Sequence, residues 1–289
     1  MPDTDAPTLR KWELGSRLRR LRLKADLSVE DAADRLLCSP SKISRLETGA
    51  RGASPRDVRD LCDLYDVDKA ERAELMELAR PIREPAYWKG MEARPNYATY
   101  MELEAAATTV HCWDTVRIPT LLQTEQYSRA VISAVEPHYS TKAVGRLVET
   151  RRYRKRLLDD SPPLQLRCVI DEAAFHRQVG GPEAMAAQIT HVVEVSKRRN
   201  VVVQLLPFRD GAHPGMDGAF TVLDFAREAV ESVVYLEGRA GGRILTEPDK
   251  TAKFIETFDL LRSNAAPQAA TQRRLQEIAE SIAPQLALK

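Results

Sequence analysis

Residues 28–49, SVEDAADRLLCSPSKISRLETG, constrain the fold most strongly, because they predict two short helices joined by a tight turn. Ser28, with Asp31 three residues later, is typical of a helix N-terminal cap. Four apolar residues then follow at the spacing of a buried helical face: Ala32, Ala33, Leu36 and Leu37. This first half of the stretch therefore predicts a short helix with one packed side.

The second half of the stretch predicts a helix with an apolar inner face and a short polar outer face. Ser39 is placed to cap this helix, Pro40 suits its first position, and Gly49 is typical of its end. Ile43 and Leu46 point inward, and the outward residues are Ser41, Lys42, Ser44 and Arg45. Such a helix suits the major groove of DNA, although an ordinary packed helical hairpin would show the same pattern.

The outer face of this second helix supplies the candidate DNA contacts. Arg45 lies one turn from Ser41 and Lys42, where an arginine can chelate O6 and N7 of guanine. Short serines let the backbone approach phosphates and can donate to them. Arg51, in the loop that follows, is a candidate phosphate contact, whereas Glu47 is expected to pair with an arginine of the first helix. Solvent exposure without any contact remains the alternative for each residue.

The neighbouring sequence shows a family resemblance that covers almost the whole chain. The run LGSRLRRLRLKADLSVEDAADRLLCSPSKISRLETGARGASPRDVRDLCDLYDV resembles the Cro/repressor-like (XRE-type) helix-turn-helix domain. The later stretches IPTLLQTEQYSRAVI, VIDEAAFHRQVGG and DGAHPGMDGAFTVLDF resemble the C-terminal domain of WhiJ-like, antitoxin-like actinobacterial transcriptional regulators. The resemblance implies a double-stranded DNA operator and a small partner protein encoded nearby. It also places Ser28 and Thr48 at helix ends where relatives touch the DNA backbone.

The candidate DNA-binding residues are therefore Ser28, Ser39, Ser41, Lys42, Ser44, Arg45, Thr48 and Arg51.

The chain is expected to be α+β, with two domains. Residues 1–7 are expected to be disordered, and residues 8–80 to form an all-α domain of five helices, the first over 12–24. A linker over 81–97, with three prolines and a glycine, precedes a larger mixed α/β domain with a small sheet over 98–289.

Charge is distributed unevenly over the first domain. The net charge of the whole chain is only +1, but residues 9–60 carry 13 Lys and Arg against 8 Asp and Glu. Residues 61–80 carry 3 against 6. The basic excess thus falls on the expected DNA-binding element, although a solvated helix face would account for so modest an excess.

The second domain is expected to alternate helices and strands. Helices are expected over 100–115, 125–135, 140–160, 171–178, 182–199 and 248–261, with a last one around Leu275 and Ile282. Strands are expected over 164–170, 201–206, 219–225 and 230–236. The helix over 140–160 is strongly basic. It presents either a solvated face or a second contact with DNA phosphates or an acidic partner.

Motifs of enzyme chemistry are missing from the sequence. The loop PFRDGAHPGMDG holds Asp210, His213 and Asp217, but the chain has no nucleophile elbow, HExxH, P-loop or GxGxxG. Its four cysteines are scattered without metal spacing. We therefore expect no catalytic residue, no cofactor, no metal and no disulfide, and a cytoplasmic, nucleoid-associated protein without a membrane span.

These observations together predict a sequence-specific, DNA-binding transcriptional regulator that acts as a homodimer. Its second domain is expected to dimerise and to bind a partner protein or an effector. A competing interpretation is a small-molecule receptor or enzyme domain tethered to DNA by the helix-turn-helix. A third interpretation is an interaction protein that has lost DNA binding. Arg45 and the basic first helix argue against it.

Overall fold

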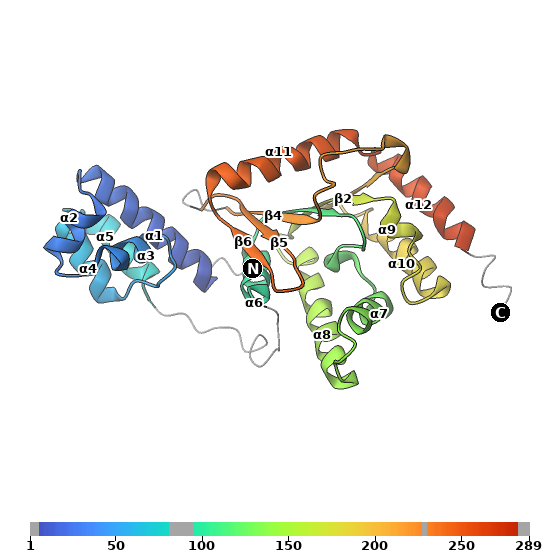
Figure 1. Ribbon diagram of the computed structural model, residues 1–289, viewed down its shortest axis with the longest axis horizontal. Helices are drawn as coiled ribbons and strands as arrows, with labels where there is room; N and C mark the ends of the chain where they lie inside the picture. The colour runs from blue at the N-terminus through green and yellow to red at the C-terminus, as the bar shows by residue number, and fades with distance from the viewer. Residues whose placement is uncertain (1–5, 81–94, 227–229, 283–289) are drawn as a thin grey trace. The chain divides into compact units, whose positions relative to one another are not determined.

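The computed structural model describes residues 6–80, 95–226 and 230–282, which form two compact units (Figure 1). The first unit holds α1–α5, and the second holds all elements from α6 onward. An all-α helix-turn-helix region is thus followed by a mixed α/β domain, as the sequence predicts.

The first unit consists of α1 (Pro7–Lys24), α2 (Val29–Arg35), α3 (Pro40–Glu47), α4 (Pro55–Leu64) and α5 (Lys69–Leu78). Side-chain oxygens cap the last four helices, and the capping residues are Ser28, Ser39, Ser54 and Asp68. Each oxygen accepts a backbone N–H that the first turn leaves unpaired. The expected five-helix count and the capping box of Ser28 are confirmed.

The start of α1 differs from the expectation. The helix begins at Pro7 and not at Trp12, and the buried Ala6 accepts a hydrogen bond from the backbone of Arg10 at 3.0 Å. The expectation of disorder is therefore wrong for Ala6 and Pro7, while residues 1–5 lie outside the described residues. Proline at the first helical position loses no hydrogen bond, which explains the early start.

Leu37 does not belong to the apolar face of α2. The helix ends at Arg35, and Leu37 adopts a φ of 50° with 94% of its surface exposed. The turn into α3 needs a left-handed residue at this point, so its geometry overrides the apolar character of the side chain.

The second unit is built on one six-stranded sheet. Its strands are β1 (Thr109–Asp114), β2 (Gln165–Asp171), β3 (Val201–Leu206), β4 (Phe220–Asp224), β5 (Val233–Leu236) and β6 (Arg243–Leu245). They lie in the order β3-β2-β1-β4-β5-β6. Strands β1, β2 and β3 are parallel, while β4, β5 and β6 are antiparallel to their neighbours. The four expected strands are found, and β6 was not anticipated.

Strand β1 corrects the expected helix over 100–115. Helix α6 covers Tyr97–Ala106, and the chain then forms the strand that joins the parallel and antiparallel parts of the sheet. Val110 and Cys112 face one side, whereas His111 and Trp113 face the other, as the contact of His111 with Phe258 shows. Both faces are covered, so the strand lacks the polar alternation that would have revealed it.

Helices cover both faces of the sheet (Figure 1). Helix α11 (Pro248–Asn264) packs on one face through Phe258 and Leu261, and α12 (Gln268–Ile282) follows it. Helices α6, α7 (Glu125–Val135) and α8 (Thr141–Arg154) lie on the other side, and α9 (Ala173–His176) and α10 (Pro182–Val195) connect β2 to β3. Short 3₁₀ turns lie at Thr120–Leu122, Lys155–Leu158 and Phe208–Asp210.

The predicted linker and the inter-strand turn lie mostly outside the described residues, which resume at Pro95 and leave out 227–229. The described end of the linker is ordered, because Tyr97 begins α6 and the side chain of Asn96 donates to the carbonyl of Gly242 at 2.8 Å.

The basic segment 140–160 is not a uniformly solvated face. Arg154 is only 2% exposed and forms a two-pronged ion pair with Glu104 at 2.6 and 2.7 Å. Arg151 donates to the side chain of Gln123, and Lys155 donates to its backbone carbonyl. Three of its cations therefore hold the second unit together. Arg152 stays exposed and pairs with Glu149.

Candidate nucleic-acid interface

Helix α3 is held against α1 by a close approach and by a buried ion pair. Gly15 lies so near that a Cβ at this position would come within 2.5 Å of the carbonyl oxygen of Glu47. Arg22 donates to both carboxylate oxygens of Glu47, at 2.6 and 2.9 Å, and to the carbonyl of Leu27 at 2.7 Å. The expected pairing of Glu47 with an arginine of the first helix is confirmed. Because the pair is buried, its hydrogen bonds fix the end of α3 in position.

Burial separates the two faces of α3 as the sequence predicts. Ile43 and Leu46 are 1% and 2% exposed and join the core of the first unit. Ser41, Ser44 and Arg45 are exposed on the other side. The structure therefore offers a polar helix face to a partner, and three of the predicted contact residues lie on it.

Arg45 is oriented by its own helix. Its Nε donates to the carbonyl of Ser41 at 3.1 Å, and its terminal nitrogens have no acceptor among the described residues. This contact points a guanidinium with two free donor groups along the exposed face. Those donors are what recognition of guanine O6 and N7 requires.

Ser39 and Lys42 lie at the beginning of α3. The hydroxyl of Ser39 accepts from the backbone N–H of Lys42 at 3.2 Å, and in the described part of the chain its own proton has no acceptor. It can therefore donate to a phosphate while it caps the helix, where the helix dipole also favours an anion.

The ammonium of Lys42 is already engaged by a carboxylate on the next helix. It lies 2.6 Å from Asp57 on α4. Partial burial raises the pKa of Asp57, but hydrogen bonds from Lys42 and Ser54 outweigh this and lower the pKa to about 2. Lys42 can reach DNA only by sharing its charge with Asp57, so the structure makes it a weaker phosphate candidate than its position in the sequence indicates.

The hydroxyls of two further candidates, Ser28 and Thr48, already donate hydrogen bonds within the protein. Ser28 donates to Asp31 at 2.6 Å and accepts from the Asp31 backbone, and Thr48 donates to the carbonyl of Ser44 at 2.9 Å. Both hydroxyls remain exposed acceptors, but a phosphate needs a donor. Their contact with DNA stays a prediction that requires these hydrogen bonds to open.

Arg51 follows α3 in an exposed loop. Its backbone N–H donates to the carbonyl of Arg45 at 3.0 Å, which keeps the loop against the end of α3. Its guanidinium has no partner in the described part of the chain. Arg56, which precedes Asp57, is 84% exposed at the start of α4 and was not anticipated. Arg56 was missed because only the tertiary structure shows that its neighbour, Asp57, contacts Lys42 of α3.

The glycine-rich loop of the second unit is explained by packing. His213 lies edge-on to Trp113, with ring centroids 5.2 Å apart, and 3.7 Å from the carboxylate of Asp171. Trp113 in turn donates to the carbonyl of Gly215 at 2.9 Å. No group of three or more His, Cys, Asp or Glu side chains in the described ranges is arranged to hold a metal ion.

Comparison with known families identifies both parts of the chain. A helix-turn-helix domain model matches residues 13–75, and the model of a domain of unknown function, DUF5753, matches residues 97–277. No curated protein and no solved structure matches the chain. None of the helices in the described residues is long and apolar enough to cross a membrane. The helix-turn-helix domain makes the chain a DNA-binding regulator, and the second match, which spans more than half of its residues, places it in the DUF5753 family.

Proposed function

We propose that this protein is a sequence-specific transcriptional regulator that reads a DNA operator with the exposed face of α3. The observation that carries the proposal is the guanidinium of Arg45: its Nε is held along an exposed helix by the carbonyl of Ser41, and its terminal nitrogens have no acceptor among the described residues. Ser39 and Arg51 flank it with donors that have no acceptor in the described part of the chain and that suit phosphates, whereas the opposite face of α3 is buried. The protein then acts in the cytoplasm, where its DNA target lies, and we assign it no catalytic activity.

Replacing two arginines separates base recognition from phosphate binding. Arg45→Ala should cost about 1–3 kcal/mol on the operator and relax the preference at one base pair. Arg51→Ala should weaken binding to all sequences alike and reduce the salt dependence of the affinity. Fluorescence anisotropy on the operator and on random duplexes, at several salt concentrations, measures both effects.

The matched control is Arg20→Ala, which removes the same charge from a 66% exposed side chain on α1 that pairs with Glu71. It should leave the base preference unchanged. If Arg45→Ala lost equal affinity on the operator and on random DNA, α3 would not read bases through Arg45.

The second unit is proposed to regulate the first, in an antitoxin-like arrangement with a small protein encoded nearby. The support for this partner is the resemblance to WhiJ-like regulators, and the size of the second unit agrees with a role beyond dimerisation. Coupling between two binding sites is reciprocal. If the neighbouring gene product changes operator affinity by some factor, the operator must change the affinity for that protein by the same factor. Titrations in both orders measure the two values, and no change in either would contradict the proposal.

A further inference from the structure

The beginning of α1 lies against the loop that follows α3. Gly49 adopts a φ of 68°, and a Cβ at this position would collide with the indole of Trp12 and lie 3.2 Å from the carbonyl oxygen of Lys11. Gly52, three residues later, lies against the side chain of Lys11. Two glycines therefore bring this loop into contact with two consecutive residues of α1, and none of the candidate DNA contacts described above comes from α1.

Tertiary contacts fix this part of α1 in the first unit. Arg10 is 8% exposed and donates to the carbonyls of Glu77 and Leu78 at the end of α5. Trp12 packs on Gly49, as described above. Because the residues on both sides of Lys11 are held in this way, the backbone of Lys11 has a defined place beside the loop.

The side chain of Lys11 runs along Gly52. Its Cγ, Cδ and Cε lie 3.9, 3.9 and 3.6 Å from the position that a Cβ of Gly52 would take, which is van der Waals contact. Since the aliphatic stem follows the loop, the ammonium, one bond of about 1.5 Å beyond Cε, lies beside the loop as well. Lys11 is exposed, and in the described part of the chain no carboxylate or other acceptor pairs with it.

The loop supplies two further donors next to this ammonium. Arg51 directly precedes Gly52, and its exposed guanidinium has no partner among the residues that the structure describes. The exposed backbone N–H of Gly52 likewise has no acceptor within the described ranges, and no side chain of its own shields it. Ammonium, guanidinium and backbone N–H groups are the donors that proteins direct at the phosphates of DNA.

We propose that α1 takes part in DNA binding through Lys11, which binds a phosphate of the DNA backbone together with the N–H of Gly52 and the guanidinium of Arg51. This inference rests on the proposed function of α3, because the loop that carries Gly52 begins where α3 ends. A phosphate contact positions the protein on the duplex and reads no base. Lys11 therefore adds affinity on every sequence and leaves the base preference to Arg45.

Fluorescence anisotropy of the full-length protein on a random-sequence duplex, at several salt concentrations, tests the proposal. Lys11→Met removes the charge but keeps an unbranched stem against Gly52. The slope of log affinity against log salt should flatten by about 0.9, the contribution of one phosphate contact on duplex DNA. Between about 50 and 200 mM salt, the parent protein should thus lose about threefold more affinity than Lys11→Met. Lys11→Arg should keep the slope of the parent.

The matched control is Lys69→Met, which removes the same charge from an exposed lysine at the first position of α5, a helix that carries none of the predicted DNA contacts. Its salt slope should equal that of the parent. Circular dichroism verifies that all variants are folded.

Replacing single phosphates of the operator by uncharged methylphosphonates provides a second readout. At one position in each half-site, the substitution should weaken the parent and Lys69→Met more than it weakens Lys11→Met, because the variant has already lost that contact. A lysine that only packs on the loop would not produce this difference.

Two results would overturn the role of Lys11 and leave operator reading by α3 intact. One is an equal salt slope for the parent and folded Lys11→Met while Arg51→Ala has a flatter slope. The other is weaker operator binding by Lys11→Met without any change in slope, which would assign Lys11 to packing alone. Absence of DNA binding by the parent protein would instead remove the proposed function, and this inference with it.

Discussion

Leu37 adopts the left-handed backbone region with a φ of 50°, and its side chain is 94% exposed. In this conformation the Cβ of leucine is sterically strained, and the exposed side chain adds almost no stabilising burial. Leu37→Asn should stabilise the first unit by about 0.5–1 kcal/mol, because asparagine tolerates this conformation. Hydrogen exchange of peptides from α2 and α3 measures the change.

The control for this prediction is Leu23→Asn, at a 60% exposed leucine inside α1. The backbone at Leu23 is helical, so asparagine should lower the free energy of unfolding of the first unit by about 0.5 kcal/mol. A stabilisation of similar size at both positions would show that loss of exposed apolar surface, and not backbone conformation, is responsible.

Asp114 predicts a pH-dependent stability. Burial raises the pKa of Asp114 to about 7 in the folded protein, so the folded state holds this proton more tightly than the unfolded chain. The free energy of unfolding should therefore fall as pH rises from about 4 to 7, by at most about 4 kcal/mol from this group. Asp114→Asn should be more stable than the parent protein at pH 8, and the difference should disappear near pH 4.

Urea denaturation at pH 4, 6 and 8 checks this prediction, and Asp114→Glu, which keeps a titratable group, is the control. Equal pH dependence in the parent and the Asn variant would assign the effect to another group.

At the scale of elements, the packing of α1 on α3 depends on Gly15. A methyl group there would meet the carbonyl oxygens of Glu47 and Leu46 at 2.5 and 2.6 Å, and backbone atoms cannot move aside cheaply. Gly15→Ala should destabilise the first unit by about 1–3 kcal/mol and weaken DNA binding, because α3 must shift.

Gly145 on α8 provides the matched control, since a Cβ there has nothing within 4 Å outside its own helix. Gly145→Ala should stabilise the second unit by about 0.5–1 kcal/mol. Hydrogen exchange in each unit measures both substitutions. If Gly15→Ala stabilised the first unit, the close packing of α1 on the backbone of α3 at this position would be contradicted.

Elements with local signals could be predicted from the sequence, and elements with non-local causes could not. Ser28, Ser39 and Ser54 predict the starts of their helices, because each capping hydrogen bond joins residues only three positions apart. Strand β1 exists because it pairs with β2 and β4, whose first residues follow it by more than fifty positions, so no local pattern separates it from a helix. The pairing of Lys42 with Asp57 is likewise set by tertiary contact between helices.

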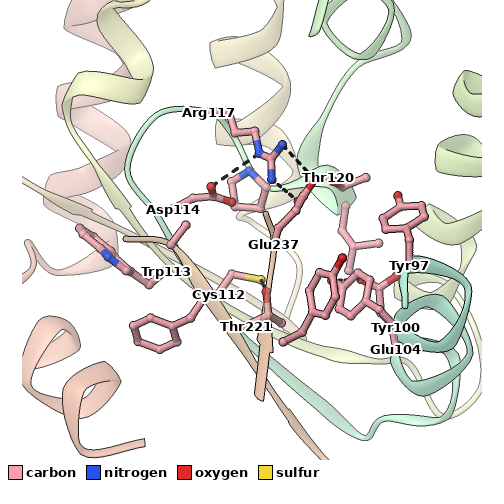
Figure 2. A pocket seen from close by; sticks show the side chains of 15 residues that line it. Tyr97, Tyr100, Glu104, Cys112, Trp113, Asp114, Arg117, Thr120, Thr221 and Glu237 are labelled. Atoms are coloured by element: carbon pink, nitrogen blue, oxygen red, sulfur yellow. Dashed lines mark hydrogen bonds and ion pairs between the residues drawn. The ribbon is translucent and has the colours of Figure 1, made fainter. Parts of the chain in front are cut away.

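The same limit applies to the small cavity that lies between α6 and the sheet of the second unit (Figure 2). Its lining comes from three separate segments, 97–121, 219–221 and 235–237, and the residues include tyrosines, acids and one arginine without a motif. Asp114 falls near the end of the helix expected over 100–115, outside the apolar face of that helix. Only the sheet turns it toward a covered face.

For the whole molecule, the small reading surface of one helix-turn-helix domain has a consequence for assembly. A single module of this kind buries about 600–1,000 Å² of protein surface on DNA, which gives modest affinity and reads few bases. Two copies on a palindrome double the contacts and match the twofold symmetry of the site. We therefore expect the full chain to act as a homodimer, held mainly by the second unit.

Sedimentation of the full-length protein at micromolar concentration, free and with an operator duplex, measures this assembly. Two chains should bind each duplex, with half-sites about 10 base pairs, or a multiple of this, apart. Inserting about 5 base pairs between the half-sites should weaken binding strongly, because it rotates one half-site to the opposite face of the DNA. Arg45→Ala should lower the affinity without changing the number of chains bound, since Arg45 lies on the exposed face of α3 and the dimer contacts are expected in the second unit. A chain that sediments as a monomer both alone and on DNA, with equal affinity for both spacings, would contradict the dimer and leave each helix-turn-helix to read its site alone.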